Sequence, residues 1–114
     1  MSNKAVDTEF LRSIIENDTG FEKELFGIFS ENAYRNMVKM EEAVKSGDNN
    51  SWYMAAHAFK GASASIGAFK LAEALEHAQK NPEENAAKKQ EMLTKVKEEF
   101  RLVLEFFNED LLDK

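Results

Sequence analysis

The chain has 114 residues, of which 43% are hydrophobic and 32% charged, and its formal net charge is -6 at pH 7. This length allows one compact domain with enough apolar surface to fill a single core. The acidic balance argues against a nucleic-acid partner, because binding to a phosphate backbone needs clustered Lys and Arg. The absence of Cys excludes disulfides, thiolate zinc sites and a Cys nucleophile.

The first residues do not resemble a targeting or membrane signal. Asp7 and Glu9 stand where a secretory leader would carry a basic stub followed by an apolar run. No apolar stretch in the sequence approaches membrane-spanning length. We therefore expect a cytoplasmic protein with no membrane partner.

The first two predicted elements are a short helix and a long one. The apolar residues at 10–15 predict the short helix, with Asp7 or Thr8 as its N-cap. The long helix is expected to begin after an Asp18/Thr19 cap and to end at Gly47. The residues expected to face inward from it are Phe21, Leu25, Ile28, Phe29, Met37, Met40 and Val44.

Three further helices are predicted from the apolar spacing of the remaining chain. One runs from Trp52 to Ile66 with a cap at Asn49 or Asn50, and Gly67 suits the left-handed residue that closes it. The next covers residues 69–80 and is ended by the only proline in the chain. The last is long, with an apolar seam of Leu93, Val96, Phe100, Val103 and Phe107.

These elements predict an all-α fold. Four amphipathic helices with short connections favour an antiparallel four-helix bundle, and the short additional N-terminal helix is expected to lie across one end. We expect one domain over residues 1–114, with residues 1–6 as a segment that could be disordered. The apolar stripes are assigned to core packing, and the protein is expected to be a monomer.

The helix at residues 52–66 has an unusual outer face. At about 100° per residue, His57 falls about 160° from the centre of the apolar cluster and should face solvent. Small or apolar residues surround it, where an ordinary exposed face would carry Glu, Lys and Gln. Gly61 is the sharpest departure, because Gly inside a helix costs up to about 1 kcal/mol relative to Ala. A partner that approaches the imidazole closely would explain these small residues.

Lys60 lies three residues after His57, so the two side chains can sit together on the helix surface. Its charge could neutralise the oxygens of a phosphoryl group carried by the imidazole. A lone exposed His beside a Lys is nevertheless inert in most proteins. These residues alone leave the function open.

The segment HAFKGASASIGAFKLAEALE, residues 57–76, resembles the signature of histidine-containing phosphotransfer (HPt) domains of two-component phosphorelays. The resemblance includes the His, the Lys three later and the Gly four later. It also includes the Ile-Gly-Ala that closes the helix and the Leu-Glu of the next helix. It covers about a fifth of the chain.

The resemblance implies that His57 accepts the phosphoryl group, that Lys60 stabilises it and that Gly61 lets a receiver domain approach. Gln79 is implied as the side chain that hydrogen-bonds the inner Nδ1 atom of the imidazole. The implied partners are receiver domains of a hybrid histidine kinase and a response regulator. Magnesium is expected on the receiver, and no cofactor is expected on this chain. No glycine-rich nucleotide loop is present, which favours a phosphohistidine carrier over an ATP-using kinase.

Two other functions stay open at this stage. A helical adaptor could use the same docking face to bind or sequester receivers without carrying phosphate. A metal-binding bundle would need an inward cluster of His and carboxylates, and the sequence offers no such spacing. The second histidine, His77, is expected to lie on an outer helix face in an ion pair with Glu73, and we assign it no role. The sequence leaves open whether the chain is free-standing or excised from a larger kinase.

Overall fold

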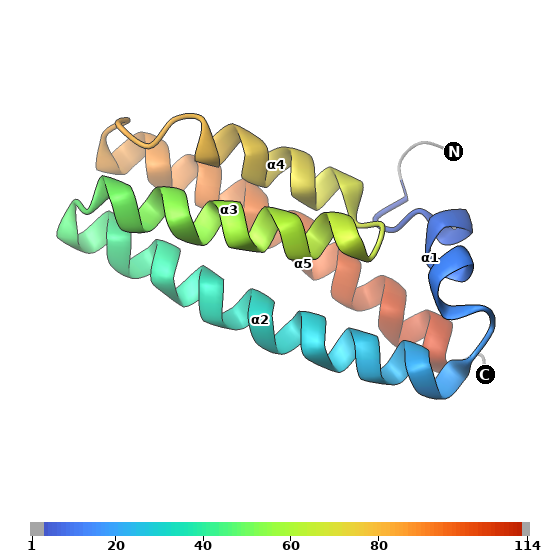
Figure 1. Cartoon of the computed structure of the whole chain (residues 1–114). Coiled ribbons are helices and arrows are strands. Elements are labelled where there is room, and N and C mark those ends of the chain that lie inside the picture. The colour runs from blue at the N-terminus through green and yellow to red at the C-terminus, as the bar shows by residue number, and fades with distance from the viewer. Residues whose placement is uncertain (1–3, 113–114) are drawn as a thin grey trace.

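The computed structural model describes residues 4–112, which form five helices and no strand (Figure 1). The helices are α1 (Thr8–Ile15), α2 (Thr19–Ser46), α3 (Asn49–Ser65), α4 (Phe69–Gln79) and α5 (Ala86–Leu112). Helices α2 to α5 form an antiparallel bundle, and α1 lies across the end where the chain begins. The predicted architecture is confirmed. No helix among the described residues is both long and apolar enough to cross a membrane.

Aspartates begin three of the helices. The side chains of Asp7, Asp18 and Asp48 each accept a hydrogen bond, at 3.0 Å, from the backbone N–H three residues later. These bonds satisfy amide groups that have no partner within the helix. The predicted cap of α3 at Asn49 or Asn50 is wrong, because the carboxylate of Asp48 takes this position one residue earlier.

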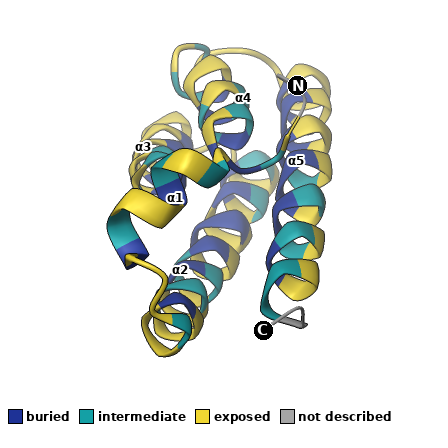
Figure 2. Ribbon diagram, turned by 90° about the vertical axis from the view of Figure 1, so that its right-hand side faces the viewer, coloured by how far each residue is buried: buried dark blue, intermediate teal, exposed yellow. Residues whose placement is uncertain are grey.

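One apolar core runs through the bundle, and Figure 2 shows the buried residues on the inner faces of the helices. Every residue of the predicted seam on α5 is buried. Helix α3 also buries one face, and Ala62 beside that face is half-buried. The buried residues of α3 are Trp52, Ala55, Ala56, Phe59 and Ser63. His57 can therefore only point away from the core.

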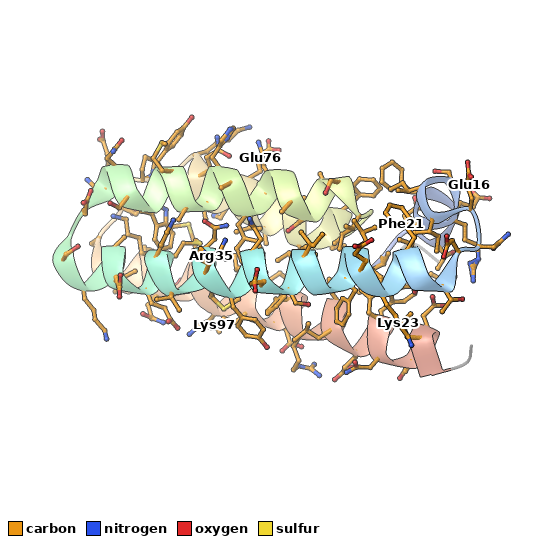
Figure 3. The ribbon with its side chains drawn as sticks, turned by 60° about the horizontal axis from the view of Figure 1, so that its bottom comes forward. Glu16, Phe21, Lys23, Arg35, Glu76 and Lys97 are labelled. Carbon is orange, nitrogen blue, oxygen red and sulfur yellow. The ribbon has the colours of Figure 1, made fainter. Side chains whose placement is uncertain are left out.

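Two of the residues predicted to face inward from α2 do not. Phe21 is 39% exposed and Ile28 is 64% exposed. The physical reason is that α2 has 28 residues and α3 has 17. The N-terminal part of α2 therefore extends beyond α3, towards α1 and the C-terminal end of α5 (Figures 1 and 3). A helix that outruns its neighbour keeps its apolar pattern but loses the surface that would cover it.

The segment before α1 is tied to the turn between α3 and α4. Val6 is fully buried, and the backbone N–H of Asp7 donates to the oxygen of Gly67 at 2.9 Å. Gly67 has a φ of 85°, as predicted for a left-handed position, and a Cβ there would lie 3.0 Å from the ring of Phe10. Val6 belongs to the segment that could be disordered, and it is buried here, whereas residues 1–3 lie outside the described part of the chain.

At the opposite end of the bundle, a buried lysine connects α5 with α3. Lys89 on α5 is only 3% exposed, and its Nζ donates to Oδ1 of Asn49 at 2.5 Å. The same ammonium group lies 5.6 Å from the centroid of the Trp52 ring, within the range of a cation–π contact. This lysine therefore joins α5 to the beginning of α3.

Candidate functional site

The imidazole of His57 lies on the outer face of α3 and is exposed, as the sequence predicts. One helical turn earlier, the ring of Tyr53 lies parallel to it, with centroids 6.2 Å apart and an interplanar angle of 3°. The phenol ring limits the directions that the imidazole can take on that side. Lys60, which is half-buried, follows one helical turn after His57 on α3.

The surface next to His57 is partly apolar and includes the small residues Ala58 and Gly61. Met54 is 58% exposed, and Ala58 and Gly61 are exposed beside it. A Cβ at Gly61 would have no neighbour within 4 Å, so nothing inside the protein requires glycine at this position. Met54 and Ala58 also line a groove between α3 and α2, which contains Lys39 on its α2 side. Another protein can therefore reach the imidazole without meeting a long side chain at Gly61.

Gln79 comes from α4, at a height on the bundle close to that of His57. Helix α3 ends eight residues after His57, and α4 begins ten residues before Gln79. The two helices are antiparallel, so these similar offsets put both residues at a similar distance from the shared turn. Among the described residues, Oε1 of Gln79 is buried and has no hydrogen-bond partner. A buried acceptor without a donor is unusual and suits a donor that arrives from the site.

An ion pair lies on α4 near Lys60. Nζ of Lys80 is 2.8 Å from Oε2 of Glu76, and Figure 3 shows Glu76 on the outer side of the α3 and α4 pair. The hydrogen bond and charge of Lys80, followed by the charge of Lys60, lower the pKa of Glu76 below its usual value. The Lys60 ammonium group therefore lies close enough to α4 to act on this carboxylate.

The predicted site residues lie on two neighbouring antiparallel helices, α3 and α4. His57, Lys60 and Gly61 share the exposed face of α3, and Gln79 stands on the neighbouring helix. The Glu76 and Lys80 pair has no role predicted from the sequence, although a spacing of four residues on a helix is a recognisable signal of an ion pair.

The second histidine is also exposed, on α4. The predicted ion pair between His77 and Glu73 is not among the ion pairs of the described residues, so that expectation is wrong. No group of three or more His, Cys, Asp or Glu side chains within residues 4–112 is arranged to hold a metal ion.

A protein-family model described as the Hpt domain matches residues 24–105. The chain belongs to the Hpt domain family. The matched range begins in α2 and ends in α5, so it includes the whole of α3 and α4 with the four candidate site residues. It leaves out α1, which the structure places across the bundle end of this Hpt chain.

A solved structure has the same fold. The crystal structure of histidine-containing phosphotransfer protein B (HptB) from Pseudomonas aeruginosa PAO1 matches with a TM-score of 0.83 at 20% sequence identity. The match covers 98% of each chain, so α1 is part of the shared fold. No curated protein sequence matches the chain significantly.

Membership of the Hpt domain family supports a histidine phosphotransfer role in phosphorelays for this chain. An exposed histidine on a helix face of small residues is the geometry that such a role needs. The phosphoryl group must be reached by a second protein in both the loading and the unloading step.

Proposed function

We propose that this Hpt chain is a phosphorelay intermediate that carries a phosphoryl group on Nε2 of His57. The donor would be the phosphorylated Asp of a hybrid kinase receiver, and the acceptor would be the Asp of a response regulator. One observation carries the proposal: His57 is exposed on α3 beside Gly61, where a Cβ would meet nothing within 4 Å. The long side chains expected on an exposed helix face are missing where a partner's Asp must approach.

The transfer needs only a neutral imidazole with its proton on Nδ1. The Nε2 lone pair attacks phosphorus, the N–P bond forms, and the O–P bond to the receiver Asp breaks. The Asp carboxylate leaves with the bonding electron pair, and Nδ1 keeps its proton. The return step is the reverse, so the chain ends each cycle unchanged. Catalysis then consists of positioning and charge stabilisation.

Two side chains would support the imidazole in this reaction. The unpartnered Oε1 of Gln79 would accept a hydrogen bond from Nδ1–H, which directs the lone pair of Nε2 outward. The Lys60 ammonium group, one turn after His57, would approach the phosphoryl oxygens as negative charge collects on them. Magnesium is expected on the receiver, where it would neutralise the same oxygens from the other side.

The docking face would be the exposed surface of α3 around His57 and Gly61, together with the adjoining groove between α3 and α2. Met54 and Ala58 supply its apolar part, and Lys39 supplies a positive charge at its edge. A small apolar area with a charged edge suits a transient complex between a monomeric carrier and its receivers. The alternative function, an adaptor that binds receivers without taking up phosphate, would use the same face.

The deciding experiment is incubation of the chain with phosphorylated receiver domains and magnesium, followed by detection of acid-labile, base-stable phosphate. Label is expected on the wild type and absent from His57→Gln, whereas the matched control His77→Gln should be labelled like the wild type. Binding to receivers without labelling of any wild-type sample would replace the carrier with the adaptor.

The role of Gln79 is tested in the same assay with Gln79→Leu and Gln79→Glu. We expect Gln79→Leu to fold normally, because it replaces a buried unpartnered acceptor with an apolar group. Its labelling rate should fall, whereas Gln79→Glu keeps an acceptor and should retain more of the rate. Equal rates for the wild type and Gln79→Leu would remove Gln79 from the site.

A further inference from the structure

The Glu76 and Lys80 ion pair lies on α4, and Glu76 is at a height on the bundle close to that of His57. Lys60 is five residues before the end of α3, and Glu76 is seven residues after the start of α4. These offsets from the shared turn put the two side chains at similar heights on antiparallel helices. The Glu76 side chain is 48% exposed, and Lys60 is half-buried. Nothing in the fold requires a carboxylate at Glu76.

We propose that Glu76 is a positioning residue that sets the phosphoryl-transfer equilibrium of His57 by competing for Lys60. The inference rests on the proposed function of His57. It adds a role for a charge that does not touch the reacting atoms, and it makes Lys80 the partner that limits how strongly that charge acts.

In the unphosphorylated protein, Glu76 interacts with two lysines. The carboxylate of Glu76 is paired with Lys80 at 2.8 Å and also interacts with the charge of Lys60. Lys60, one helical turn after His57, therefore already interacts with a carboxylate on α4 before phosphate arrives. This placement needs no large movement of Lys60 when phosphate arrives.

Phosphorylation changes the balance of charge in this region. The phosphoryl group brings nearly two negative charges, and these compete with Glu76 for the single charge of Lys60. Glu76 also repels the phosphoryl group directly, by an amount that Lys80 partly cancels. Both effects raise the free energy of the phosphorylated form relative to the free imidazole. Glu76 therefore favours onward transfer, in which the N–P bond breaks and the O–P bond to the receiver Asp forms.

The variants Glu76→Gln and Lys80→Met test this balance in opposite directions. Glu76→Gln removes the competing charge, and we expect the equilibrium with a given receiver to shift towards phosphohistidine by about two- to five-fold. Lys80→Met leaves Glu76 without its partner and should shift it towards the receiver. Glu73→Gln is the matched control, because this exposed carboxylate lies on the same helix in the groove facing α5. It should behave like the wild type.

The measurement is the distribution of labelled phosphate between the chain and one receiver at equilibrium, at low and high salt. The shift caused by Glu76→Gln should shrink at high salt, because it arises from partly exposed charges. The shift caused by Glu76→Gln should also be smaller in a Lys60→Met background. In that background only the direct repulsion between Glu76 and the phosphoryl group remains to be removed. A merely structural role for Glu76 would predict neither dependence.

The outcomes separate the two proposals. If the wild type takes up label on His57 but Glu76→Gln matches Glu73→Gln at all salt concentrations, the role of Glu76 is refuted and the carrier function stands. If the wild type takes up no label from any receiver, the carrier function fails, and the role of Glu76 fails with it. Circular dichroism of each variant verifies that the bundle is intact.

Discussion

The indole Nε1 of Trp52 donates a hydrogen bond to the backbone oxygen of Ala78 at 2.8 Å, across the buried interface between α3 and α4. The bond satisfies two buried polar groups at once, and one of them lies directly beside Gln79 in the chain. Because His57 is on the helix that donates and Gln79 on the helix that accepts, this bond fixes the relative height of the two candidate site residues.

Replacement of this tryptophan should therefore affect stability and the site together. Trp52→Phe removes the donor and opens a small cavity, whereas the backbone N–H of Asn81 still donates to the Ala78 oxygen at 3.2 Å. We therefore expect a loss of about 2 kcal/mol in unfolding free energy. Urea denaturation followed by far-UV circular dichroism measures it, since the variant has no Trp fluorescence. The exposed substitution Tyr34→Phe serves as control and should change stability little. A loss as small as that of the control would mean that the bond does not hold the two helices in register.

Substitution of Gly61 should change the stability of the fold and the rate of phosphotransfer in opposite directions. Nothing lies within 4 Å of a Cβ at Gly61 or at Gly27, and both are helical. Gly→Ala at either position should stabilise the fold by about 0.5–1 kcal/mol. Only Gly61→Ala should slow phosphotransfer, because its methyl group lies on the docking face. Thermal denaturation and the receiver assay give the two readouts. Equal transfer rates for both variants would show that Gly61 is not needed for docking.

Gly67 is expected to be far less tolerant than Gly47, although both have a left-handed backbone. A Cβ at Gly47 meets nothing within 4 Å, whereas at Gly67 it would lie 3.0 Å from the Phe10 ring and 3.2 Å from the backbone oxygen of Asp7. Gly47→Ala should cost about 1–2 kcal/mol from backbone strain alone. Gly67→Ala should cost more and loosen α1. The two losses are compared by urea denaturation, and equal values would contradict the close approach of α1.

Asp48 predicts a dependence of stability on pH. Hydrogen bonds from the backbone and hydroxyl group of Ser51 lower the pKa of Asp48 below its usual value of 3.8. A carboxyl whose pKa is lowered on folding stabilises the protein above its usual pKa, and this contribution disappears as the pH falls through the lowered pKa. The melting temperature of the wild type should exceed that of Asp48→Asn at neutral pH. The difference should shrink when the pH drops below 3.8. A difference that does not change with pH would assign the effect to the shape of the cap.

Much of the fold could be predicted from local chemistry. The 3.6-residue spacing of apolar side chains defines the helices, and capping aspartates and left-handed glycines mark their ends. The same periodicity puts His57 opposite the core of α3, because direction around a helix depends only on position along it. The all-α bundle and the exposure of His57 could therefore be predicted without knowledge of any neighbour.

Contacts between different helices could only be decided by the tertiary structure. Phe21 and Ile28 follow the inward pattern of α2, yet they are exposed because α2 outruns α3. The buried Oε1 of Gln79 has no hydrogen-bond partner, and the charge of Lys60 acts on Glu76. Both features depend on α3 and α4 lying side by side. Periodicity within one helix fixes the direction in which a side chain points. Whether that side chain is buried, finds a hydrogen-bond partner or interacts with another charge depends on its distance to a different helix.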